Sequence, residues 1–169
     1  HRLLARDVSR LLLGRNLECA QCHDHPTVVD YKQSEFFGLV AFLDRSYLYR
    51  DKKTNQSFLI EKGLGKPLEF TSVFTSESKK TGPQLLGGAM IEVPVFEEGK
   101  ELQEASDKGG PPLPKFALRP LLAKQLTSQN RAFNRNLANR LWAMMMGLGV
   151  VSPLDMQHPA NPASHPKLL

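Results

Sequence analysis

Apolar residues recur with helical spacing at the start of the chain. The stripe consists of Leu4, Val8, Leu11 and Leu12. This spacing of i, i+4, i+7 and i+8 predicts an amphipathic helix over residues 2–13. Gly14 follows the last apolar residue, and a glycine in that place is typical of a helix end. The helix would therefore stop just before the segment that contains both cysteines of the chain.

A second apolar pattern predicts a helix over residues 32–43. Its aromatic-rich face consists of Phe36, Leu39, Val40 and Leu43, widened by Phe37 and Phe42. Such a face is most often part of the hydrophobic core. The alternative is that this helix covers one face of a bound cofactor.

Helical periodicity returns in the last third of the chain, over residues 117–126 and 131–147. The apolar face of the second of these helices consists of Phe133, Leu137, Leu141, Met144, Met145 and Leu148. Arg135 and the three asparagines at positions 134, 136 and 139 lie mostly off this face. We therefore expect the leucines and methionines to be buried and the asparagines to face solvent.

Between the helical parts, apolar and polar residues alternate with a period of two. The alternation covers residues 68–74 and 91–95, and residues 57–60 form another short extended run. Period-two alternation indicates half-buried strands, and Pro94 would place the last strand at an edge. We predict a small antiparallel sheet within residues 57–96 and a mainly α fold with a small antiparallel β insertion, of the α+β class.

A charged and then Gly/Pro-rich segment, residues 97–115, has the composition of an exposed linker. It predicts a boundary between a unit over residues 1–96 and a second, helical unit over residues 116–169. The chain opens on His1 and closes on a segment that resembles the start of another helix. We therefore expect a fragment of a larger protein.

Composition narrows the class of partner. The 169 residues carry a net charge of +5, but the basic residues are scattered and form no Lys/Arg block. A solvated basic surface is favoured over a nucleic-acid interface. No apolar run is long enough to predict a transmembrane segment. The motifs of serine hydrolases, zinc proteases and P-loop proteins are absent from the sequence, so no catalytic constellation is found and enzymatic activity stays open.

The chemistry of the chain is concentrated in residues 19–23, Cys-Ala-Gln-Cys-His. Cys-x-x-Cys-His is the attachment signature of c-type haem, in which two thiols bond one porphyrin and the histidine is the proximal iron ligand. Two other interpretations remain open. Cys19, Cys22, His23 and His25 could bind zinc, although four zinc ligands usually come from two separated pairs. The two thiols could also form a redox dithiol or a disulfide.

Residues elsewhere could complete a haem site. Met90, which follows two glycines, is our candidate for the sixth iron ligand, and an open sixth position is the alternative. Arg140 could pair with a haem propionate or could bond a neighbouring carbonyl. The Asp24 carboxylate could orient an imidazole or could face solvent.

Several segments resemble a known family. They are residues 13–26 (LGRNLECAQCHDHP), 36–39 (FFGL), 41–43 (AFL), 133–142 (FNRNLANRLW), 147–155 (GLGVVSPLD) and 161–169 (NPASHPKLL). The first three resemble the planctomycete cytochrome-type domain of unknown function (PSCyt-like). The last three resemble the start of the partner domain that usually follows it (PSD-like).

This resemblance implies a larger, periplasmic or secreted multidomain protein and carries over Cys19, Cys22 and His23 as the haem-attachment residues. The expected function is an extracytoplasmic cytochrome-like module that transfers electrons. Its partner would be a redox protein or a neighbouring cytochrome-like domain of the same protein. The alternative is a structural zinc, dithiol or disulfide module within a secreted scaffold or a carbohydrate-related oxidative assembly.

Overall fold

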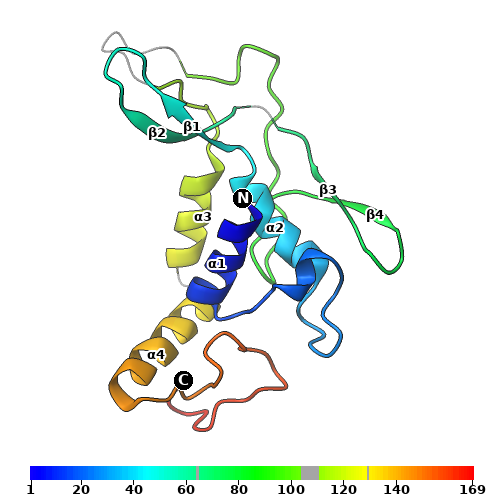
Figure 1. The fold of residues 1–169 in the computed structure, drawn as a ribbon, viewed down its shortest axis with the longest axis vertical. Helices are drawn as coiled ribbons and strands as arrows, with labels where there is room; N and C mark the ends of the chain where they lie inside the picture. Colours follow the sequence, from blue (N-terminus) through cyan, green and yellow to red (C-terminus); the bar gives the residue numbers. More distant parts are fainter. Residues whose placement is uncertain (64, 104–110, 129) are drawn as a thin grey trace.

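The computed structural model describes residues 1–63, 65–103, 111–128 and 130–169. Within them the α-helices are α1 (Arg2–Leu13), α2 (Gln33–Leu43), α3 (Leu118–Thr127) and α4 (Arg131–Met146), with a short 3₁₀ turn, η1 (Cys19–Gln21). The strands are β1 (Ser46–Arg50), β2 (Ser57–Glu61), β3 (Leu68–Thr71) and β4 (Ser78–Thr81). The predicted α+β class, mainly α with a small amount of antiparallel β structure, is confirmed (Figure 1).

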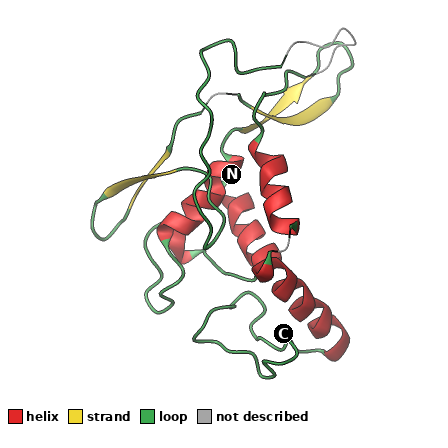
Figure 2. Ribbon diagram, turned by 180° about the vertical axis from the view of Figure 1, so that it is seen from behind, coloured by secondary structure: helices red, strands yellow, loops and turns green. Residues whose placement is uncertain are grey.

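Helix α2 forms the centre of the fold. It contacts α1, α3 and strands β3 and β4, and its residues from Phe36 to Leu43 are all buried. A helix that is apolar on every side is stable only when other elements surround it. The prediction that its aromatic face belongs to the core is therefore confirmed, and α1 and α3 lie beside α2 (Figure 2).

Helix α1 has the predicted bounds but buries a different face. Ala5, Ser9 and Leu13 are buried, whereas Leu4 and Leu11 of the predicted stripe are exposed. Small residues on the buried face allow two helix backbones to approach closely. The buried Ser9 hydroxyl donates to the Arg6 carbonyl at 2.8 Å, so its burial leaves no donor unpaired.

Helix α4 also has nearly the predicted bounds and an inverted face. Asn136 and Asn139 are buried, while Leu137 is 46% and Met144 is 82% exposed. The expected burial of its leucines and methionines is therefore wrong. The asparagines are buried because their amides bond backbone groups: Asn136 donates to the Leu11 carbonyl at 2.7 Å, and Asn139 bonds both polar groups of Val151.

The β structure consists of two separate antiparallel hairpins instead of one sheet within residues 57–96. Strand β1 pairs with β2, and β3 pairs with β4. The predicted strand over residues 91–95 is not formed; its neighbour Met90 makes only an isolated bridge with Gln84. In the β1–β2 turn, the Asp51 carboxylate accepts from the Lys53 amide at 2.7 Å, a local bond that favours the reversal.

One hydrophobic core joins both sides of the predicted linker. Leu118, Leu122 and Leu126 of α3 pack in the same cluster as the aromatic residues of α2. The start of α3 is capped by the buried Glu61 carboxylate, whose oxygens accept from the Leu118 amide at 2.7 Å and the Arg119 amide at 2.9 Å. The division into two domains stays a prediction, and residues 104–110 of the predicted linker lie outside the described residues.

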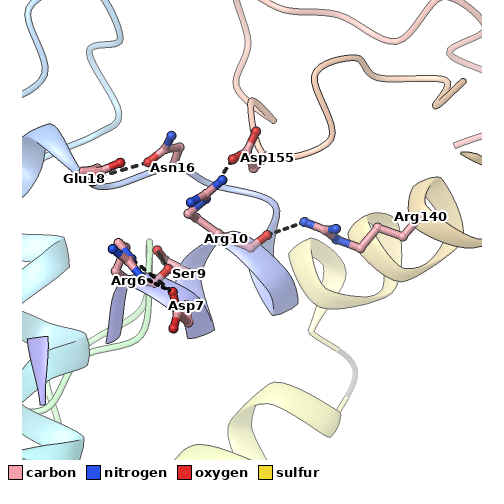
Figure 3. Close-up of polar contacts among 8 residues, drawn as sticks. All are labelled: Arg6, Asp7, Ser9, Arg10, Asn16, Glu18, Arg140 and Asp155. Atoms are coloured by element: carbon pink, nitrogen blue, oxygen red, sulfur yellow. Dashed lines mark hydrogen bonds and ion pairs between the residues drawn. The ribbon is translucent and has the colours of Figure 1, made fainter. Parts of the chain in front are cut away.

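Polar contacts tie the C-terminal segment to α1 (Figure 3). The Arg10 guanidinium donates to the Asp155 carboxylate at 2.9 Å, and the Arg10 carbonyl accepts from Arg140 at 2.7 Å. The Asn16 amide donates to the Asp155 carbonyl at 2.7 Å. The loop after α4 is thereby held beside the segment that leads into the two cysteines.

Candidate functional site

The segment that contains both cysteines is a single 3₁₀ turn anchored in the core. Leu17 and Ala20 are fully buried and fix the turn, whereas Cys19 and Cys22 are exposed. The Cys19 carbonyl accepts from the Cys22 amide at 3.2 Å. Side chains three residues apart eclipse on a 3₁₀ helix, so the two thiols lie on the same side of the turn. Both thiols are free.

The hydrogen bond of the His23 ring fixes which nitrogen can act as a ligand. Nδ1 lies 2.7 Å from the Asp24 carbonyl oxygen. A carbonyl can only accept, so Nδ1 carries a proton, and in the neutral ring Nε2 keeps its lone pair. Histidine ligands of metals are typically oriented in this way, by a bond from the other ring nitrogen to a carbonyl or carboxylate.

The tip of the second hairpin lies against this motif. The Val73 amide donates to the Cys22 carbonyl at 3.0 Å, and the Phe74 ring centroid lies 4.6 Å from that of His23. Val73 and Phe74 are 63% and 77% exposed. The imidazole therefore borders an open apolar surface and is not enclosed by packed side chains.

The Asp24 carboxylate does not orient an imidazole. It accepts from the Gln33 amide at 2.8 Å, at the start of α2, and pairs with Lys32 at 3.3 Å. Partial burial would by itself raise the pKa of Asp24, but the Gln33 amide and the Lys32 ammonium outweigh it and lower that pKa. It is the backbone carbonyl of Asp24, instead, that orients His23.

His25 has a different role from His23 in this structure. Its Nδ1 accepts from the Val28 amide at 3.0 Å and the Thr27 amide at 3.3 Å, so Nε2 carries the proton of the neutral ring. The ring meets Tyr31 edge-on at 5.7 Å. Among the described residues, no three or more His, Cys, Asp or Glu side chains gather as a metal-binding group.

The remaining predicted residues lie apart from the motif. The Met90 sulfur accepts from the Gly82 amide at 3.1 Å, and Met90 lines a cavity of about 640 Å³ that neither cysteine nor His23 lines. Arg140 bonds the Arg10 carbonyl, as the second of its two interpretations proposed.

The apolar hairpin tip beside His23 is not predicted by the sequence pattern. The alternation predicts one strand over residues 68–74, but β3 ends at Thr71 and the chain turns immediately after it. The polar run from Thr75 to Ser78 was a turn signal, and the Ser76 backbone adopts a positive φ of 57° there.

Comparison with known proteins gives one partial match. Residues 2–47 match the family model described as PSCyt2, a protein of unknown function (DUF1549). No curated protein and no solved structure matches the chain. None of the described helices combines the length and the apolar character needed to cross a membrane. The matched region contains α1, the Cys-x-x-Cys-His turn and α2, so this part of the chain is supported as a PSCyt-like domain of unknown function.

Proposed function

We propose that residues 19–23 attach one c-type haem and that the chain is an extracytoplasmic, cytochrome-like electron-transfer module. The observation that carries the proposal is the geometry of the turn. Two free, exposed thiols share one side of η1, and the next residue, His23, has its Nε2 lone pair free. These are the groups that covalent attachment and proximal ligation require.

Attachment needs accessible thiols. Each S–H group would add across one vinyl double bond of the haem: the sulfur would bond one carbon, the hydrogen would go to the other, and no oxidant would be consumed. Cys19 and Cys22 are both exposed, so both can react. When bound, haem would supply a one-electron ferric/ferrous couple.

The surroundings of His23 suit a large apolar ligand. Its ring is held from one side by the Asp24 carbonyl and is contacted by Phe74. The exposed rings and methyl groups of Phe74 and Val73 would be removed from water by a porphyrin, which stabilises binding in proportion to the apolar area covered. Met90 stays the candidate sixth ligand, and as such it would have to leave the Gly82 amide.

This proposal includes location and partner. Covalent haem attachment to Cys-x-x-Cys-His takes place outside the cytoplasm, so we place the protein in the periplasm or among secreted proteins. Its redox partner would be a separate protein or a neighbouring cytochrome-like domain of the same protein. The alternative is a dithiol or disulfide, which the shared side of the two free thiols also favours; zinc on Cys19, Cys22, His23 and His25 is a third possibility.

The test is to export the chain to the periplasm of a bacterium that expresses a c-type haem maturation system. We expect a Soret band that survives acid–acetone extraction and a pyridine haemochrome spectrum of the thioether-bound type. The Cys19→Ala/Cys22→Ala variant should lose covalent haem. His23→Ala should keep covalent haem but lose its proximal ligand, whereas the matched control His25→Ala should leave the spectrum unchanged.

Other outcomes would contradict the proposal. Colourless protein with stoichiometric zinc would favour the metal site. Colourless protein whose mass is two hydrogen atoms lower than expected, and is restored by a reductant, would favour the disulfide. If the Cys19→Ala/Cys22→Ala variant retains haem that resists extraction, the assignment of Cys19 and Cys22 as attachment residues is wrong.

A further inference from the structure

A second cavity, separate from the cysteine motif, lies between α1, α4 and the proline-rich C-terminal segment. Its volume is about 580 Å³. Its cationic and imidazole wall consists of Arg15, Arg131, Arg135 and His158. Its apolar wall includes Pro159, Pro162 and Pro166. No Asp or Glu among the described residues lines it.

The charges of this cavity are largely uncompensated. Arg131 and Arg135 make no ion pair or side-chain hydrogen bond with any described residue, and Arg15 reaches Glu35 only at 3.7 Å. Arg131 and Arg135 are four residues apart on α4, so their side chains lie on one face of the helix. Arg131 is also the first residue of α4, where the helix dipole adds partial positive charge. The cavity therefore attracts anions.

Hydrogen bonds hold the frame of the cavity in place. Arg15 pairs with Met156 in an isolated antiparallel bridge, and the Gln157 amide donates to the Gly14 carbonyl at 2.9 Å. The Gln157 side chain donates to the buried Asn136 amide oxygen at 3.2 Å. Because α1, α4 and the C-terminal segment are joined through these bonds, the backbone positions from which the arginines extend are set before a ligand arrives.

We propose that this cavity binds a small organic phosphate or sulfate monoester. Guanidinium groups pair with oxyanions through parallel N–H donors, and a tetrahedral group offers three terminal oxygens to more than one arginine at once. A carboxylate offers only two oxygens and uses fewer of these donors. The prolines that also line the cavity would cover the organic part of the ester. The inference does not depend on the haem proposal, since neither Cys19, Cys22 nor His23 lines the cavity.

The first measurement is calorimetric titration of the full chain with phenyl phosphate, phenyl sulfate, inorganic phosphate and benzoate. Sodium chloride keeps the ionic strength equal in all titrations, because unspecific attraction to a basic surface is screened by salt. We expect at least one ester to bind about fivefold or more tightly than inorganic phosphate, owing to burial of its ring. The comparison of the two esters separates phosphate from sulfate recognition. Benzoate should bind more weakly than the preferred ester.

The second measurement locates the site. Arg131→Gln/Arg135→Gln should weaken binding of the preferred ester about a hundredfold, since each charged hydrogen bond lost typically costs about a factor of ten or more. Arg50→Gln, on β1, removes the same kind of charge outside the cavity and should change affinity less than twofold. Circular dichroism of both variants checks that the fold is kept.

Several results would overturn the inference. Equal loss in the α4 double variant and in Arg50→Gln would mean attraction by net charge alone. Ester binding no tighter than that of inorganic phosphate would show that the organic part of the ester does not contribute to binding. Binding of benzoate as tight as that of both esters would contradict a site for tetrahedral oxyanions.

Discussion

Replacing Asn139 with alanine tests whether a buried amide holds the loop that follows α4. The Asn139 side chain is fully buried. Its Nδ2 donates to the Val151 carbonyl at 2.8 Å, and its Oδ1 accepts from the Val151 amide at 2.8 Å. The side chain thus satisfies both backbone polar groups of one buried residue, and the substitution removes both bonds at once.

The expected loss follows from those two bonds. Each buried polar group left without a partner costs about 1–3 kcal/mol. Asn139→Ala strands one donor and one acceptor on Val151. Alanine gains about 0.6 kcal/mol over asparagine in helix propensity, which offsets a small part. We expect the free energy of unfolding to fall by about 1–5 kcal/mol.

The assay is urea unfolding followed by circular dichroism, with Asn134→Ala as the matched control. Asn134 lies on the same helix, is exposed, and its side chain bonds no described residue, so its replacement should raise stability by about the 0.6 kcal/mol of helix propensity and should not lower it. Hydrogen exchange of the Val151 amide should also accelerate in Asn139→Ala. A stability change equal to that of the control, with Val151 still protected, would refute the reasoning.

Three further predictions concern titration and backbone conformation. Tyr31 is buried and donates to the Gln157 carbonyl at 3.3 Å, and burial raises its pKa to about 12. Absorbance at 295 nm should therefore show a tyrosine ionisation step near that pH, and Tyr31→Phe should remove this step. Burial outweighs the nearby Arg15 and raises the pKa of Glu35, so the folded state binds this proton more tightly than the unfolded state does. The protonated Glu35 carboxyl therefore contributes to the free energy of unfolding below pH 4.5, and this contribution is lost as pH rises through the folded-state pKa. In urea unfolding, Glu35→Gln should not show this pH-dependent loss of stability. Gly14 has φ +66°, and a Cβ added there would lie 2.6 Å from the nearest side-chain atom, whereas Gly147 has φ +84° and open space around it. We therefore expect Gly14→Ala to lower the free energy of unfolding by about 2–4 kcal/mol and Gly147→Ala by about 1 kcal/mol. Thermal melts of the two variants check this difference.

Sequence patterns predicted the elements better than their orientation. The bounds of α1 and α4 were predicted well because their final glycines adopt the left-handed conformation that ends helices. The prediction of which face of α4 is buried was wrong because periodicity reflects hydrophobicity and not hydrogen-bond partners. Asn136 is buried against the carbonyl of Leu11, 125 residues away in sequence, and no local pattern contains that contact.

Strands were predicted where apolar residues alternate and missed where pairing alone creates them. Strand β4, Ser78–Thr81, contains no large apolar residue and exists because a turn brings it beside β3. The pair Cys19 and Cys22 was evident from spacing, since it lies within one turn. The contact of Phe74 with His23 was not, because it depends on how the second hairpin packs on that turn.

The outward-facing end of α4 has a chemical consequence. Met144, Met145 and Met146 are adjacent, and all three are more than half exposed. Thioethers in contact with solvent are oxidised readily, and each sulfoxide turns an apolar side chain into a polar one. Mild peroxide should thus add up to three oxygen atoms at this end of the helix, making this surface more hydrophilic without disturbing the interior; Met90, which is 57% exposed, is a further site of oxidation.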